Sequence, residues 1–176
     1  MSTKLRNILN ILLILLILVD LGYSFKQHYS KPLDGDMAWN LIPAHDVAPV
    51  LDRPFGTKAI LNNETYINPN RFFCHWFYRE YLMNAPLVIQ KVAKPIDSVY
   101  LSCAISKTLT QAFLIMLIAM LISGSRKLLN TEFLLSAFLI TCLFQTNGFD
   151  RSMGIIDSST TYLFFYGLPA LILLTY

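Results

Sequence analysis

Apolar residues gather into four runs along the chain, and polar residues fill the segments between them. Clustered rather than alternating apolar positions are typical of helices that cross a membrane. The pattern predicts an all-α integral membrane protein with about four transmembrane helices, at residues 7–24, 98–123, 131–146 and 161–176. Because the last run is short and the chain stops inside it, we expect a single membrane domain that is a fragment of a longer polytopic chain.

The segment 25–97 is the longest polar stretch, and turn formers such as Lys31-Pro32 and Asp34-Gly35 interrupt it. We expect short amphipathic helices between these breaks, the first with Asp34 or Asp36 as its N-cap. The second mixes aromatic residues with arginines, which is typical of a helix lying in the headgroup layer. The expected helices span Asp36–Leu41, Asn70–Asn84 and Pro86–Ala93.

Basic residues indicate the orientation of the spans. Lys4 and Arg6 precede the first span, and Arg126-Lys127 follow the second, whose helix should begin at Pro95 and end near Ser123-Gly124. Both basic segments should lie in the cytoplasm. The N-terminus is then cytoplasmic, while residues 25–97 and the loop 146–160 are extracytoplasmic, in a plasma membrane that would be a bacterial inner membrane.

Composition agrees with this assignment. The chain is 55% hydrophobic and only 14% charged, with a mean hydropathy of +0.49, whereas about a quarter of a soluble domain is charged. The net charge of +3 is spread out, with no basic block that would indicate a nucleic-acid partner. The three cysteines have no metal-binding spacing.

Four acidic residues are candidates for chemistry. Asp34 and Asp36 directly follow the first span, where such a pair could share a divalent cation or supply a general base. The same residues are equally compatible with an Asp-Gly turn that caps a helix. Asp150 and Asp157 lie in the second outer loop and would assist from the same membrane face, unless that loop is simply solvated.

Basic side chains could bind the phosphate of a lipid, although general attraction to anionic lipid is an alternative. Lys107 lies inside the second span, where a charge usually pairs or lines a polar cavity. It could also pair with Asp20 or extend toward the interface. The candidates for phosphate binding are Arg71, His75, Arg79 and Lys107.

This layout resembles the membrane glycosyltransferases of the GT-C superfamily. The residues that carry the resemblance are the acidic motif Asp34-Gly35-Asp36, the amphipathic helix Arg71–Met83, and Asp150 or Asp157. The resemblance implies transfer of a sugar from a polyprenyl-phosphate donor at the extracytoplasmic face, with Asp34 or Asp36 activating an acceptor hydroxyl. The family has more spans than four, and the loop also resembles those of bacterial membrane proteins.

Two other functions fit the same pattern. One is a non-enzymatic membrane scaffold or assembly subunit whose external loop binds a partner. The other is a transporter, suggested by Asp20 and Lys107 within spans. An enzyme requires Asp34, Asp36 and the second outer loop to line one cavity, whereas a scaffold would expose an apolar patch on the loop.

Overall fold

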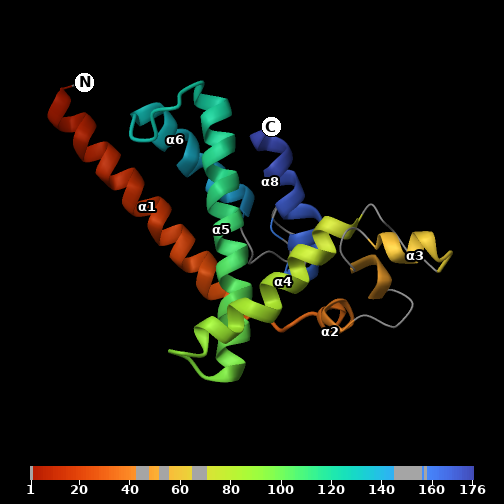
Figure 1. The fold of residues 1–176 in the computed structure, drawn as a ribbon. Coiled ribbons are helices and arrows are strands. Elements are labelled where there is room, and N and C mark those ends of the chain that lie inside the picture. Colours follow the sequence, from red (N-terminus) through yellow and green to blue (C-terminus); the bar gives the residue numbers. More distant parts are fainter. Residues whose placement is uncertain (1, 43–47, 52–55, 65–70, 145–155, 157) are drawn as a thin grey trace. The chain divides into compact units, whose positions relative to one another are not determined.

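The computed structural model describes residues 2–42, 48–51, 56–64, 71–144, 156 and 158–176. Within these ranges the chain is helical and contains no strand (Figure 1). The elements are α1 (Thr3–Ser30), α2 (Asp36–Leu41), η1 (Ala48–Leu51), α3 (Thr57–Leu61), α4 (Phe72–Ile89), α5 (Pro95–Ser123), α6 (Thr131–Ile140), η3 (Thr141–Phe144), α7 (Thr160–Tyr162), η4 (Leu163–Gly167) and α8 (Leu168–Thr175).

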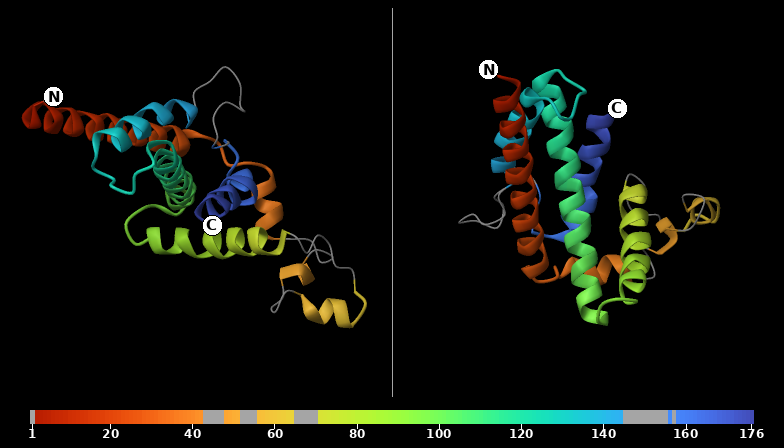
Figure 2. Two further views of the ribbon diagram at one scale, coloured as in Figure 1. Left: turned by 90° about the horizontal axis from the view of Figure 1, so that it is seen from above. Right: turned by 90° about the vertical axis from the view of Figure 1, so that its left-hand side faces the viewer.

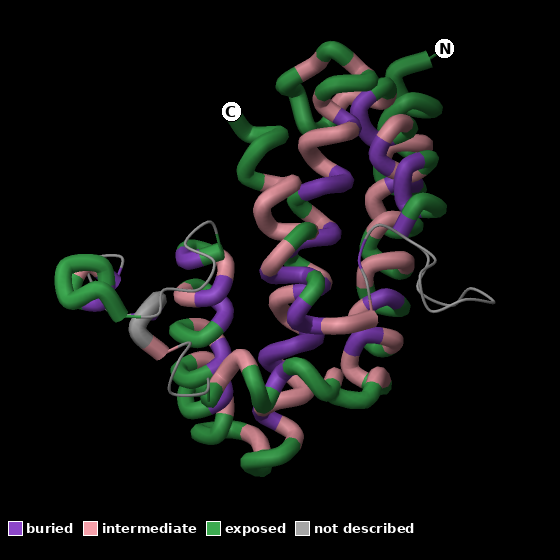
Figure 3. The backbone as a smooth tube through the Cα atoms, turned by 90° about the vertical axis from the view of Figure 1, so that its right-hand side faces the viewer, coloured by how far each residue is buried: buried purple, intermediate pink, exposed green. Residues whose placement is uncertain are grey.

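The helices fall into two compact units. The first unit consists of Met1–Lys31, Ala104–Ser158 and Ala170–Tyr176, and the second of Pro32–Cys103 and Ser159–Pro169. Most of the predicted external loop therefore lies in the second unit, together with the start of the last apolar run. Buried and exposed stretches alternate along the described helices (Figure 3).

Two helices among the described residues, α1 and α5, are long and apolar enough to cross a membrane. Their 28 and 29 residues correspond to a length of about 42 to 44 Å, more than the ~30 Å of a hydrocarbon core. The apolar helices Thr131–Phe144 and Thr160–Thr175 are shorter. Two of the four predicted spans thus reach the required length, and the third and fourth stay predictions.

The ends of the long helices follow from local sequence. α1 begins after Ser2, whose hydroxyl accepts a hydrogen bond from the Leu5 amide at 3.3 Å. It extends to Ser30, beyond the predicted loop boundary at residue 25. It ends there because Pro32 forces the preceding Lys31 into an extended conformation, and no helix breaker occurs earlier. α5 begins at Pro95 and ends at Ser123, as predicted.

Polar side chains join the helices of the first unit. α1 and α6 lie side by side (Figure 2), and the Asn10 side chain joins them, donating to the Leu129 carbonyl at 3.0 Å and accepting from the Thr131 hydroxyl at 2.8 Å. Deeper in the unit, the buried Gln111 amide donates to the Ser24 hydroxyl at 3.0 Å. These contacts fix the register of otherwise apolar helices.

The helix α4 organises the second unit. The sequence predicted two helices here, broken before Pro86, and that prediction is wrong: a single helix runs from Phe72 to Ile89. Pro86 removes one backbone N–H, yet it lies on the same buried face as Tyr78 and Leu82, so packing of that face continues the helix through it. The predicted cap, Asn70, lies outside the described residues, and Arg71 occupies the cap position.

The last helical run contains a π-helical turn, η4, just before Pro169. Proline at that position cannot donate to the Phe165 carbonyl, and its ring would clash with that carbonyl in a regular α-helix. The wider turn accommodates the proline and brings two consecutive rings, Phe164 and Phe165, against α4.

Candidate functional site

The short helix α2 is attached to α4 by its C-terminal end. His75 Nε2 donates to the Asn40 carbonyl at 2.7 Å, and Arg79 Nε donates to the Leu41 carbonyl at 3.3 Å. The last carbonyls of a helix have no partner within the helix, so these two side chains satisfy them. They also fix the position of Asp36, which is exposed in the first turn of α2.

Asp34 caps a helix, but not the predicted one. The N-cap of α2 is Gly35, which makes no side-chain capping bond, so the prediction of Asp34 or Asp36 in that role is wrong. The Asp34 carboxylate instead accepts from the amides of Thr160 and Thr161, at 2.7 and 3.3 Å, and from the Thr161 hydroxyl at 2.7 Å. It therefore joins the start of the external segment to the start of the last apolar run.

A buried hydroxyl extends this contact into the core of the second unit. The Thr161 hydroxyl lies 3.4 Å from that of Tyr78, whose side chain is fully buried. Because the Thr161 proton is given to Asp34, the Tyr78 hydroxyl is the donor in this pair. Burial raises the pKa of Tyr78, and the nearby charge of Asp34 raises it further, so the phenol keeps its proton.

Aromatic rings and a guanidinium group surround the outer part of this cluster. The Phe164 ring meets Tyr78 edge-on at 5.1 Å between centroids, and the Phe165 ring lies 6.1 Å from that of His75. The Arg71 guanidinium lies over the face of Phe165, 5.7 Å from its centroid. This stacking holds an exposed cation at the N-terminal end of α4.

The surroundings of His75 favour its neutral form. A carbonyl oxygen can only accept, so Nε2 of His75 carries the proton that is given to Asn40. Burial lowers the pKa of His75 below its usual value, and the neighbouring charge of Arg79 lowers it further. Arg71 and Arg79 are therefore the cations of the predicted phosphate-binding group in the second unit.

Lys107 belongs to the first unit and is buried. Its side chain is 1% exposed, and its ammonium group donates to the Ser158 carbonyl. This contact satisfies a charge within an apolar helix, and the assignment of Lys107 to a lipid phosphate stays a prediction. Asp150 and Asp157 lie outside the described residues, so their meeting with Asp34 and Asp36 also stays a prediction.

The partners of Asp34 were not predicted from the sequence. The run Ser159-Thr160-Thr161 before an apolar stretch is a recognisable helix start, and the Ser159 hydroxyl does accept from the Tyr162 amide at 3.2 Å. That signal marks the helix end but not the distant carboxylate that caps it. Nothing in the sequence singled out Tyr78 as the buried residue that completes the cluster.

The candidate ligands for a divalent cation are Asp34 and Asp36. The part of the chain that the structure describes holds no group of three or more His, Cys, Asp or Glu residues that could bind a metal. Both oxygens of Asp34 already accept hydrogen bonds, which leaves Asp36 as the one carboxylate of the predicted pair with an exposed side chain. Binding of a divalent cation by this pair stays a prediction.

Comparisons of the chain with protein-family models, curated proteins and solved structures found no match. Its function is therefore inferred from the residues and geometry described above.

Proposed function

We propose that the chain is an integral membrane protein that transfers a sugar from a lipid-phosphate donor, in the manner of GT-C glycosyltransferases, with Asp36 as the base. The supporting layout is an order of elements: a long apolar helix, an acidic pair directly after it, short helices, and a second long helix. The same order underlies the resemblance seen in the sequence.

The membrane placement is supported by the surface of α1. Only 11% of its most apolar window is buried, and most of its leucine and isoleucine side chains are exposed. Exposed apolar surface of this extent is costly in water and favourable in lipid. In our proposal α1 and α5 cross a bacterial inner membrane with the N-terminus in the cytoplasm and residues 32–97 on the other side.

The observation that carries the catalytic proposal is that the two neighbouring carboxylates have different surroundings. Asp34 is used in capping, whereas Asp36 is exposed one short helix away from the Arg79 guanidinium. The six residues of α2 separate their two ends by about 8 Å. That spacing suits a base at the acceptor and a cation at the departing phosphate.

In the proposed reaction, Asp36 takes the proton of an acceptor hydroxyl as its oxygen bonds to the anomeric carbon of the donor sugar. The bond from that carbon to the phosphate oxygen breaks, and the lipid phosphate leaves with the electron pair. Arg79 and Arg71 stabilise the charge that develops on the phosphate. Asp34 is a positioning residue, because it holds the segment that carries Asp36.

The test is the variant D36N in the full chain, assayed in membranes for sugar transfer from polyprenyl-phosphate donors. We expect transfer to be lost while the unfolding temperature is unchanged, since Asp36 is exposed. The variant D97N changes one aspartate in the first turn of α5 and serves as a matched control that retains activity. Full transfer by D36N would remove the assignment.

A membrane scaffold is the second candidate, and the exposed apolar side chains of the second unit favour it. They include Trp39 at 63%, Ile42 at 80% and Leu61 at 83% exposed. Site-specific photocrosslinkers at these positions, in cells, distinguish the alternatives. A single protein crosslinked at all three sites, with equal yield in the chain that carries D36N, would support the scaffold.

A further inference from the structure

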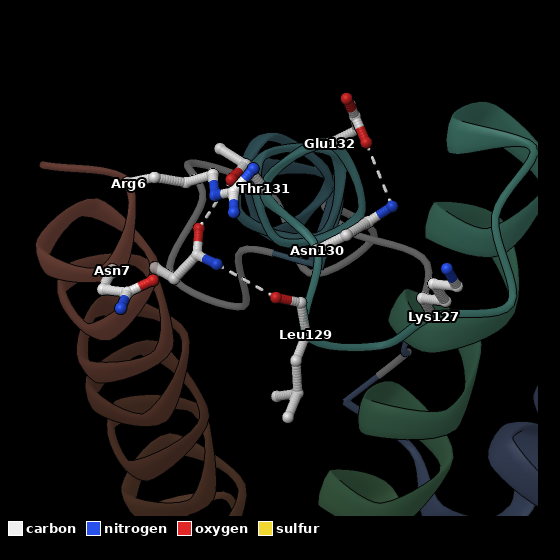
Figure 4. Close-up of a pocket in the computed structure, with 8 residues that line it drawn as sticks. Arg6, Asn7, Lys127, Leu129, Asn130, Thr131 and Glu132 are labelled. Atoms are coloured by element: carbon white, nitrogen blue, oxygen red, sulfur yellow. Dashed lines mark hydrogen bonds between the residues drawn. The ribbon is translucent and has the colours of Figure 1, made fainter. Parts of the chain in front are cut away.

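A pocket with a volume of about 440 Å³, lined mainly by polar residues, opens in the first unit (Figure 4). The start of α1, the segment after α5 and the start of α6 form its walls, although α1 and α6 are more than 100 residues apart in sequence. Its lining residues are Arg6, Asn7, Asn10, Lys127, Leu129, Asn130, Thr131 and Glu132.

Hydrogen bonds fix the walls of this pocket. Asn10 binds both Leu129 and Thr131, which attaches α1 to the opposite wall. Asn130 caps α6 by accepting from the Phe133 amide at 2.8 Å. Its side-chain amide donates to Ser125 Oγ and Glu132 Oε2, both at 3.0 Å. The shape of the pocket is therefore fixed by hydrogen bonds within the first unit.

The charges of the lining suit a phosphate group. Arg6 and Lys127 provide two cations, and Figure 4 shows them on either side of Asn130 and Thr131. Glu132 is the single carboxylate of the lining and is hydrogen-bonded to Asn130. Guanidinium, ammonium and side-chain amide groups all donate to phosphate oxygens, and the lining includes one of each in Arg6, Lys127 and Asn7.

We propose that this pocket binds the phosphate of an anionic lipid headgroup. Arg6 lies two residues before the apolar run that begins at Ile8, and Lys127 lies four residues after the end of α5. With α1 and α5 across a membrane, both cations reach the level of the headgroups. The volume falls within the range of pockets that hold small molecules, about 300 to 1,000 Å³. The proposal rests on the membrane placement but not on sugar transfer.

The experiment measures lipid binding to the full chain in detergent by native mass spectrometry, with dioctanoyl phosphatidic acid and dioctanoyl phosphatidylcholine as probes. The double variant R6Q/K127Q should lower the affinity for phosphatidic acid about tenfold or more. The matched control K4Q/R126Q removes two charges from the same segments outside the pocket and should retain the affinity. Equal losses in the two variants would overturn the proposal.

The charge of the pocket and the source of the phosphate are tested separately. E132Q removes the negative charge of the lining and should bind phosphatidic acid more tightly, a gain that misfolding cannot produce. Inorganic phosphate should not displace the lipid at matched concentration, and displacement would identify free phosphate as the ligand instead.

The same assay separates lipid binding from the proposed sugar transfer and from the membrane placement. D36N should retain lipid binding, because Asp36 lies outside the pocket. Extraction of the membranes with carbonate tests whether the chain is integral, without reference to any bound lipid. Failure of the lipid proposal is therefore distinguishable from failure of the transferase proposal or of the membrane placement.

Discussion

The two units use apolar and polar residues in opposite ways. In the first, α1 buries only Leu13, Ser24 and His28, and two of these three are polar. In the second, α4 buries a continuous face, and side chains near helix ends bind the backbone of other elements. The helix α1 leaves most of its leucine and isoleucine side chains exposed, whereas hydrogen bonds between its own segments specify the second unit.

The extent of a helix and its position against other segments therefore depend on different residues. The apolar runs determine where the long helices begin and end, but they leave large surfaces that any apolar partner can cover. The contacts of Asp34, His75 and Arg79 join segments that are 35 to 127 residues apart. Substitutions should therefore have opposite consequences in the two units, depending on whether they remove apolar or polar atoms.

The largest difference is expected between L82A and L18A. Leu82 is 5% exposed on the buried face of α4, and its truncation should cost about 2 to 5 kcal/mol of unfolding free energy. Leu18 is 58% exposed on α1, so its truncation should cost less than about 1 kcal/mol. Circular dichroism in detergent follows the helices of both units, while Trp39 and Trp76, which both lie in the second unit, report its unfolding by fluorescence. Equal losses would contradict the comparison.

The next effect is expected from D34A. Removing a carboxylate that accepts three hydrogen bonds should cost about 2 to 3 kcal/mol, because two helix amides and a hydroxyl lose their acceptor. The exposed Asp36 provides the control, and D36A should leave the midpoint of urea unfolding within experimental error. A stable D34A protein would show that Ser159 alone is a sufficient cap for this helix.

Much of the fold could be predicted because it depends on local signals. Pro95 begins α5, Ser123 ends it, and Asp36–Leu41 forms a helix, all as the sequence indicated. Pro86 misled the prediction, since a proline usually marks a helix boundary but is tolerated where tertiary packing continues the helix. The error therefore lies where a long-range contact overrides a local preference.

The candidate site could be predicted only in part. The position of Asp34 and Asp36 after the first apolar run made both residues candidates. Their roles differ because Thr160 and Thr161 donate hydrogen bonds to Asp34 alone. No local pattern reveals which of two neighbouring carboxylates will bind a segment 126 residues away. The same holds for His75, because burial of its ring lowers its pKa and no local pattern reveals that burial.

A smaller effect should distinguish two glycines, one in each unit. Gly124 follows α5 with φ of +62°, in the left-handed region, so G124A should cost about 1 kcal/mol through backbone strain. Gly35 has a helical backbone with φ of −65° and no atom within 4 Å of an added Cβ, so G35A should be tolerated. Thermal unfolding followed by circular dichroism measures both, and an unchanged midpoint for G124A would mean that this position is not strained by a side chain.

The smallest effect at neutral pH is expected from H75Q, because glutamine can still donate to the Asn40 carbonyl. The difference should appear in acid. The pKa of His75 is lowered in the folded state, so below about pH 6.5 the unfolded chain binds a proton that the folded chain does not. The stability of the second unit should then fall as the pH decreases from about 7.5 to about 5, and less steeply in H75Q. Urea unfolding followed by tryptophan fluorescence at both pH values measures this, and the other titratable groups are the same in the two proteins. Parallel pH profiles would mean that folding does not lower the pKa of His75 and that its ring is not buried in the way described.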